Sequence, residues 1–285
     1  MKFIILTANG SITLTRNSNA TVAKVGEKIF DNDKLKVGKK SYLNLAYQDG
    51  KTLEIKSAGS YNTSKLITMV NSKKNSSAKK FSSYVLAQFV KSVDDLGDMK
   101  VTGSVERAVK PSIDYGTPYN TNILDPVVTL CWYPVSGNSY TVKLTDVSGN
   151  VLYSKQLSDT SITLNLQELN LSRDKSYKWS IKNNKKEKAI TDTCKFHWLA
   201  KGTADSIKKS AGKLLKDIDK LDHSIKQTLL ASFYSDNKLY IDMLEAYQRA
   251  IVLSPDNKTI KLLYYNALNK TGLTRTASSI KNQLN

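Results

Sequence analysis

The chain has 285 residues, of which 43 are Lys or Arg and 25 are Asp or Glu, and its formal net charge is +18 at pH 7. This length allows two or three domains with cores of their own. No apolar run approaches the roughly 18–20 residues of a membrane span, so no transmembrane segment is expected. Only five of the basic residues are Arg, the side chain that grips phosphates and bases with a bidentate fork. A solubilising lysine surface is therefore favoured over a polyanion-binding site.

The N-terminal apolar run covers only residues 3–6 and is followed by Asn9-Gly10. It is shorter than the roughly 7–15 apolar residues of a signal-peptide core, and we interpret it as a first strand. Two compartments stay open. The protein is periplasmic or otherwise exported if a signal has been removed from this chain, and it is cytoplasmic otherwise.

Residues 1–60 are predicted to form an all-β module. Apolar side chains alternate with polar ones, the period of a half-buried strand, at Ile12, Leu14, Leu43, Leu45 and Tyr47. Asp49-Gly50 then separates two alternating runs. Asp-Gly at such a place predicts a hairpin, because Gly accepts the positive φ of a tight turn.

These residues resemble the FecR-type domain over about residues 9–60. The resemblance rests on a glycine–acid turn at 26–29, a step at 33–37, an alternating strand at 43–45 and an Asp-Gly hairpin at 49–55. The chain has Val-Gly-Lys-Lys where that family usually has Thr-Gly. Family members are typically exported bacterial proteins in which the domain serves signalling or binding, so the resemblance implies no catalytic residues.

A connector is expected to complete a first domain of residues 1–110. Thr63 or Ser64 is predicted to cap a short helix through Val70, and apolar residues at helical spacing predict a second helix over about 78–96. We favour packing of this second helix on the β module over a partner-binding role. The basic stretch before it is a candidate polyanion site, formed by Lys73, Lys74, Lys79 and Lys80. Pro111, Gly116 and Pro118 indicate a linker after it.

Residues 121–200 are predicted to form a β-sandwich, because six short alternating runs follow one another with turn residues between them. The runs are residues 127–134, 140–144, 151–157, 162–166, 177–181 and 194–198. Their order of Trp, Pro, Tyr and Gly is similar to fibronectin type III and immunoglobulin-like domains. The resemblance implies that Trp132 and either Tyr177 or Trp179 anchor the core, and it says little about function.

Residues 203–285 change to helical spacing. Four apolar stripes are expected in this all-α segment, with Pro255 ending one helix and Asp256 or Asn257 capping the next. The run AYQRAI at 246–251, followed by LSPDN at 253–257, resembles the second helix and exit turn of a tetratricopeptide repeat, within a helical-repeat segment of about 225–285. The resemblance implies a concave docking surface near Tyr240, Tyr247 and Tyr264.

The sequence offers no recognisable catalytic or metal-binding constellation. It contains no nucleophile elbow, phosphate loop or dinucleotide fingerprint. Cys194 and His197 have the spacing of half a metal site, but a strand would place them on opposite faces. A disulfide between Cys131 and Cys194 stays open. We therefore expect no enzyme, metal, cofactor or small-molecule substrate.

The sequence thus predicts a multi-domain chain with a β module, an immunoglobulin/fibronectin-like β-sandwich and an α-helical end. Because all three resembled modules occur in binding roles, the favoured function is a non-enzymatic protein–protein scaffold or adaptor with an unknown partner. The combination resembles uncharacterised exported proteins of the bacterial cell envelope. The alternative is a basic protein that binds an anionic polymer, either nucleic acid or an envelope polymer.

Overall fold

The computed structural model describes residues 1–49, 51–72, 113–135, 139–185, 193–219, 221–281 and 283. The chain divides into two compact units. Unit 1 holds the described residues of Met1–Val101, Gly212–Ser232 and Ala246–Leu263. Unit 2 holds those of Thr102–Ala211, Phe233–Glu245 and Tyr264–Asn285. Helical residues therefore belong to both units, a grouping that differs from the three consecutive domains expected from the sequence.

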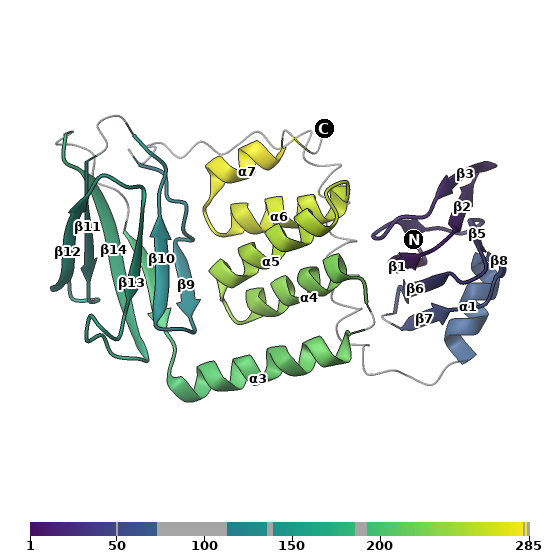
Figure 1. Ribbon diagram of the computed structural model, residues 1–285, viewed down its shortest axis with the longest axis horizontal. Helices are drawn as coiled ribbons and strands as arrows, with labels where there is room; N and C mark the ends of the chain where they lie inside the picture. The colour runs from purple at the N-terminus through teal and green to yellow at the C-terminus, as the bar shows by residue number, and fades with distance from the viewer. Residues whose placement is uncertain are drawn as a thin grey trace. The chain divides into compact units, whose positions relative to one another are not determined.

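The β strands of unit 1 form two four-stranded sheets, with the orders β4-β1-β6-β7 and β3-β2-β5-β8 (Figure 1). The strands are β1 (Phe3–Asn9), β2 (Ile12–Arg16), β3 (Asn19–Val22), β4 (Lys28–Ile29), β5 (Lys34–Val37), β6 (Tyr42–Tyr47), β7 (Thr52–Ile55) and β8 (Gly59–Asn62). The alternation in the sequence explains them, because Leu43 and Leu45 face Ile55 and Leu53 across β6 and β7. The β-rich N-terminal part and the hairpin at Asp49 are confirmed.

A single buried core joins the two sheets and the helix that follows them. It includes Phe3, Leu14, Leu35 and Leu45 from the strands, and Leu66 from α1 (Thr63–Ser72). The N-cap of α1 is Asn62, whose Oδ1 accepts the Lys65 N–H at 2.8 Å. Thr63 and Ser64 were the expected caps, and that expectation is wrong. The Thr63 hydroxyl instead donates to the carbonyls of Phe30 and Asp33.

The outer face of the first sheet in unit 1 is also buried. Ile4 and Ala46 are paired across β1 and β6, and they are at most 1% exposed although they point away from the core. Two hydrogen bonds attach residues from the C-terminal part of unit 1 to this module. Thr7 Oγ1 accepts the N–H of Asp222 at 2.9 Å, and Asn257 Nδ2 donates to the Val25 carbonyl at 2.9 Å. The module is therefore completed by residues about 200 positions further along the chain.

The strands of unit 2 form a two-stranded sheet, β10-β13, and a five-stranded sheet in the order β12-β11-β14-β15-β9. They are β9 (Asn120–Ile123), β10 (Val127–Cys131), β11 (Tyr140–Thr145), β12 (Val151–Leu157), β13 (Ser161–Asn165), β14 (Lys175–Asn183) and β15 (Cys194–Trp198). Six of these strands coincide with the runs expected from the sequence. The strand β9 was not expected from the sequence, because its residues are mostly polar and do not alternate clearly.

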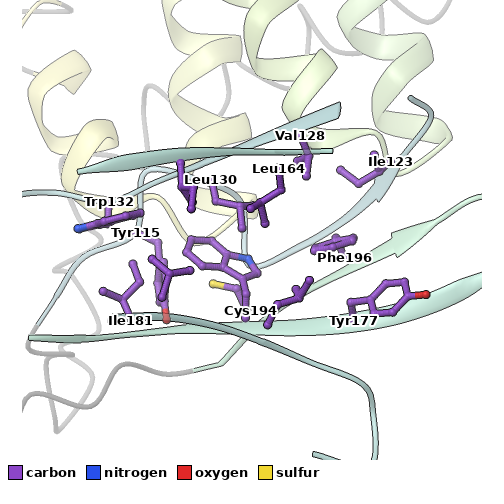
Figure 2. Packing of buried hydrophobic residues seen from close by; sticks show 14 of the residues in the cluster. Tyr115, Ile123, Val128, Leu130, Trp132, Leu164, Tyr177, Ile181, Cys194 and Phe196 are labelled. Carbon is purple, nitrogen blue, oxygen red and sulfur yellow. The ribbon is translucent and has the colours of Figure 1, made fainter. Parts of the chain in front are cut away.

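Figure 2 shows the core between these two sheets, where Leu130 and Leu164 face Ile181 and Cys194. Trp132, Tyr177 and Trp179 are each at most 4% exposed, as the resemblance implied for core anchors. Ile113 and Tyr115 also belong to this core, with 0% and 3% exposure. The interpretation of this stretch as a linker is therefore wrong, because Pro and Gly indicate turns but do not exclude burial.

The helical end of the chain begins after β15. It comprises α3 (Lys201–Asp217), α4 (His223–Asp236), α5 (Tyr240–Leu253), α6 (Lys258–Lys270) and α7 (Thr274–Lys281). Asn257 caps α6, because its Oδ1 accepts the Ile260 N–H at 3.2 Å. The helical C-terminal part is thus confirmed. No helix among the described residues is long and apolar enough to cross a membrane. The connecting helix expected over 78–96 lies outside the described residues.

Candidate functional site

The two edge strands of the five-stranded sheet in unit 2 have different surroundings. The edge of β9 is covered by the α4–α5 loop. Asn122 N donates to the Lys238 carbonyl at 2.9 Å, and Thr121 Oγ1 accepts the Tyr240 N–H at 3.0 Å. Asn122 Nδ2 adds a bond to the Asn237 carbonyl at 2.8 Å. These bonds occupy backbone groups that an edge strand otherwise presents to other chains.

A second turn covers the start of the same edge. Tyr119 N donates to the Thr271 carbonyl at 3.3 Å, just before β9. Gly272 follows with φ +84° and lies so close that a Cβ there would be 2.5 Å from Tyr119 Cδ2. Only glycine fits this position, since its backbone conformation is left-handed and the ring leaves no room for a side chain.

The opposite edge strand, β12, pairs only with β11 among the described strands. Tyr153 and Leu157 are partly buried against the core and hold the strand in place. The side chains of Ser154, Lys155 and Gln156 are exposed. A seven-residue edge strand that is anchored from one side and open on the other is a template for an added strand.

Apolar side chains gather at the start of this open edge. Val147 and Val151 are each 57% exposed, and Leu152 is 41% exposed. Val147 lies in the β11–β12 turn, and Val151 and Leu152 follow it. In this turn the backbone N–H and side-chain amide of Asn150 donate to the two oxygens of Asp146 at 2.9 and 2.8 Å. These bonds hold the pKa of the Asp146 carboxyl below its usual value, chiefly through the Asn150 side chain. The turn is thus ordered, and it presents three apolar side chains beside free strand backbone.

The three expected docking tyrosines have different environments. Tyr247 is 7% exposed and Tyr264 is 4% exposed, so both contribute to packing and offer little surface to a partner. Tyr240 is half-buried, and the Lys270 ammonium lies 5.4 Å from its ring centroid. The tetratricopeptide resemblance that pointed to these tyrosines rests on a local motif, which does not tell which helix faces other elements cover. Lys73, Lys74, Lys79 and Lys80 lie outside the described residues.

The cysteines and histidine considered as ligands do not converge. Cys131 and Cys194 are present as thiols. Cys194 is fully buried, whereas His197 is half-buried on the opposite side of β15, where Nδ1 lies 3.1 Å from Ser176 Oγ and Nε2 lies 3.5 Å from Asp174 Oδ1. In the part of the chain that the structure describes, no three His, Cys, Asp or Glu residues are grouped to hold a metal.

Comparison with known proteins gives no family assignment. No family model matches the chain, and no curated protein matches it either. Among solved structures, a "Cell surface anchoring domain" is 24% identical over 21% of this chain and 82% of that chain, with a TM-score of 0.20. A two-domain fibronectin type III segment from chicken tenascin is 14% identical over 68% of this chain and 82% of that chain, with a TM-score of 0.19.

A third solved structure, Astrotactin-2, described as a vertebrate-specific and perforin-like membrane protein, is 11% identical. The match covers 75% of this chain and 50% of that chain, with a TM-score of 0.19. TM-scores this low carry no argument about fold or function. The functional interpretation therefore rests on the residues and geometry of this chain.

Proposed function

We propose that the protein is a non-enzymatic scaffold or adaptor of the bacterial cell envelope, in which unit 2 carries an immunoglobulin/fibronectin-like interaction module. The strand pairing supports this, since the second and fifth strands form one sheet, while the third, fourth, sixth and seventh form the other with the first strand added in parallel beside the seventh. Tyr177 adds support, because its Oη donates to the Ser172 carbonyl and accepts the Ser172 N–H, both at 2.8 Å. A tyrosine bonded back in this way is a mark of such domains.

The observation that carries the binding role is the asymmetry of the five-stranded sheet. Its β9 edge is closed by backbone and side-chain hydrogen bonds, whereas β12 offers strand backbone beside Val151 and Leu152. The partner is a protein that adds an extended segment along β12 and covers these apolar side chains. Backbone hydrogen bonds supply affinity in this mode, and side-chain contacts supply specificity.

The other modules have supporting roles in this proposal. The N-terminal strands act as a FecR-like binding module, and the helical end acts as a tetratricopeptide-like support. The proposal includes a periplasmic or other exported location, which the resemblance of the N-terminal strands to exported bacterial proteins supports. The proposal assigns no catalytic residue, cofactor or small-molecule substrate.

Site-specific photocrosslinking of the full chain in the bacterium that produces it tests the proposal. A photoreactive residue at position 156, which is exposed on β12, should give a discrete protein adduct. The double substitution Val151→Lys/Leu152→Lys should abolish the adduct, because lysines on an edge oppose strand addition. Because both side chains are exposed, the free energy of unfolding should change by no more than about 0.5 kcal/mol.

Val127→Lys is the matched control, because Val127 is a 53% exposed valine on β10 of the other sheet. It should leave the adduct unchanged. An adduct that survives Val151→Lys/Leu152→Lys, or that disappears equally in Val127→Lys, would rule out partner binding at β12.

A further inference from the structure

The outward face of the five-stranded sheet carries a group of lysines that the sequence does not place together. Along β11, β14 and β15, core side chains alternate with half-buried or exposed polar ones. The polar positions therefore share the face opposite the core. Four of them are lysines, Lys143, Lys178, Lys182 and Lys195, which we name the lysine face.

Strand register determines the spacing of the lysine face. Lys178 lies directly opposite Lys195. Lys143 lies opposite Ser180, between Lys178 and Lys182 on the neighbouring strand. Diagonal cross-strand neighbours of this kind are about 7–8 Å apart. The four lysines thus occupy neighbouring positions across three strands, and the Lys178 ammonium also donates to the Val147 carbonyl at 2.8 Å.

Within the described strands of this sheet, no acidic side chain interrupts the lysine face. The described strands β9, β11, β12, β14 and β15 contain six lysines and no Asp or Glu. The described carboxylates nearest in sequence lie at the ends of strands, where Asp146 is bonded to Asn150 and Asp174 lies 3.5 Å from His197. Like charges directly opposite each other destabilise a sheet, and Lys178 and Lys195 occupy such opposite positions. A bound polyanion removes that repulsion.

The face also indicates which polyanion fits. The outward positions between the lysines are small hydroxyl side chains, including Thr141, Ser176 and Ser180, and none of these strands presents Trp, Tyr or Phe on this side. Sites for single-stranded nucleic acid stack bases on aromatic rings. His197 is the one ring on this face of the three strands, and it is engaged by Ser176 and Asp174. Lysine contacts phosphate as a point charge without needing a planar fork.

We propose that the lysine face binds a linear phosphodiester polymer whose recognition does not involve bases. The polymer lies across β11, β14 and β15, with successive phosphates near successive ammonium groups. The surrounding hydroxyls donate further hydrogen bonds to its oxygens. None of these four lysines belongs to β12 or to the basic stretch at 73–80.

Fluorescence anisotropy with two labelled oligomers of equal length tests this proposal on the full chain. One probe is a dT oligomer, and the other is its abasic deoxyribose-phosphate analogue, which has the same backbone without bases. Both should bind with the same Kd. Four phosphate contacts predict a log–log salt slope of about −2.8, or about a 50-fold loss of affinity between about 50 and 200 mM salt.

Charge-removing variants then locate the site. Lys143→Gln/Lys182→Gln should halve the salt slope to about −1.4, since two of four contacts are lost. Lys34→Gln/Lys36→Gln is the matched control, because both lysines are exposed on β5 of unit 1 and the same charge is removed. That control should keep the wild-type slope and Kd.

Three results would overturn the proposal. The first is dT binding about tenfold or more tighter than the abasic oligomer, since one stacked base contributes about 1–3 kcal/mol. The second is an equal loss in both double variants, which would indicate diffuse attraction by net charge. The third is polygalacturonate, a carboxylate polymer of equal charge, competing as well as or better than unlabelled abasic oligomer.

Discussion

The Arg16 guanidinium forms a bidentate ion pair with the buried carboxylate of Asp33, with Nε 3.0 Å from Oδ1 and Nη2 2.7 Å from Oδ2. Asp33 is only 3% exposed, and it also accepts the Phe30 N–H at 2.8 Å. The guanidinium donates to the Lys28 carbonyl and lies 4.8 Å from the centroid of the Phe30 ring. The pair therefore ties β2 to the turn between β4 and β5.

Removing the cation should destabilise unit 1. Arg16→Met leaves a buried carboxylate without its ion pair, and we expect the free energy of unfolding to fall by about 2 kcal/mol, less than for a fully buried pair because Arg16 is 41% exposed. Urea unfolding followed by circular dichroism measures this. Lys2→Met, which removes the exposed Lys2–Asp31 pair, should change stability by less than about 0.5 kcal/mol. Equal effects of the two substitutions would contradict a stabilising role for the pair.

The same pair predicts how stability depends on pH. Burial alone would raise the pKa of Asp33, but the Arg16 guanidinium and the Phe30 N–H outweigh it and hold the pKa below its usual value. A lowered folded-state pKa gives stability above the unfolded value of about 3.9, and that stability is lost as pH falls through the folded value. Unfolding free energies of wild type and Asp33→Asn should therefore converge below about pH 4. If the unfolding free energies of the two proteins stayed equally far apart down to pH 2, the lowered pKa of Asp33 would be refuted.

Tyr177 should stabilise unit 2 through its hydroxyl. Tyr177→Phe keeps the ring and removes both hydrogen bonds to Ser172, so we expect a loss of about 1–2 kcal/mol. All three tryptophans lie in unit 2, at 132, 179 and 198, so their fluorescence reports its unfolding. Tyr153→Phe changes a half-buried tyrosine on β12, and it should lower the free energy of unfolding much less. If both variants unfold at the same urea concentration, the Tyr177 bonds contribute nothing.

Asn257 should link helix capping to the integrity of the N-terminal module. Asn257→Ala removes the cap on Ile260 and the bond to the Val25 carbonyl, and we expect a loss of about 1–2 kcal/mol in unit 1. Hydrogen exchange should speed up at the amides of both Ile260 and Gly26, whose N–H bonds to the Ile5 carbonyl. Asn62→Ala removes only a cap, on α1, and should leave Gly26 protected. Unchanged hydrogen exchange at the Gly26 amide in Asn257→Ala would show that Asn257 does not stabilise the N-terminal module.

Local patterns predicted much of this fold. Alternation around Leu43 and Leu45, with Asp49-Gly50 after them, specifies the β6–β7 hairpin because the turn and the pleat depend on neighbouring residues. Asn257 after Pro255 likewise specifies the start of α6. The cover on β9 was not predictable, because Asn122 and Lys238 are 116 positions apart and neither residue type indicates the other.

The sequence predicted the candidate surfaces less well than it predicted the strands and helices. The tetratricopeptide resemblance implied a docking surface near Tyr247 and Tyr264, yet both are buried, since a local motif does not tell which face other elements cover. The lysine face draws residues from three strands, and only register brings Lys143 beside Lys178. One signal was available beforehand, namely the complete lack of Asp and Glu in the strand segments between 140 and 198.

Residues from the C-terminal part of the chain complete the unit of the N-terminal strands, and this has a consequence for biosynthesis. Residues 212–232 and 246–263 belong to the same unit as β1–β8. During translation, Ile4 and Ala46 emerge from the ribosome long before the segments that complete their unit. Nascent chains must therefore carry an uncovered apolar sheet through most of synthesis, which makes a holding chaperone valuable at that stage. A gene fragment that stops near codon 200 would leave this exposure permanent.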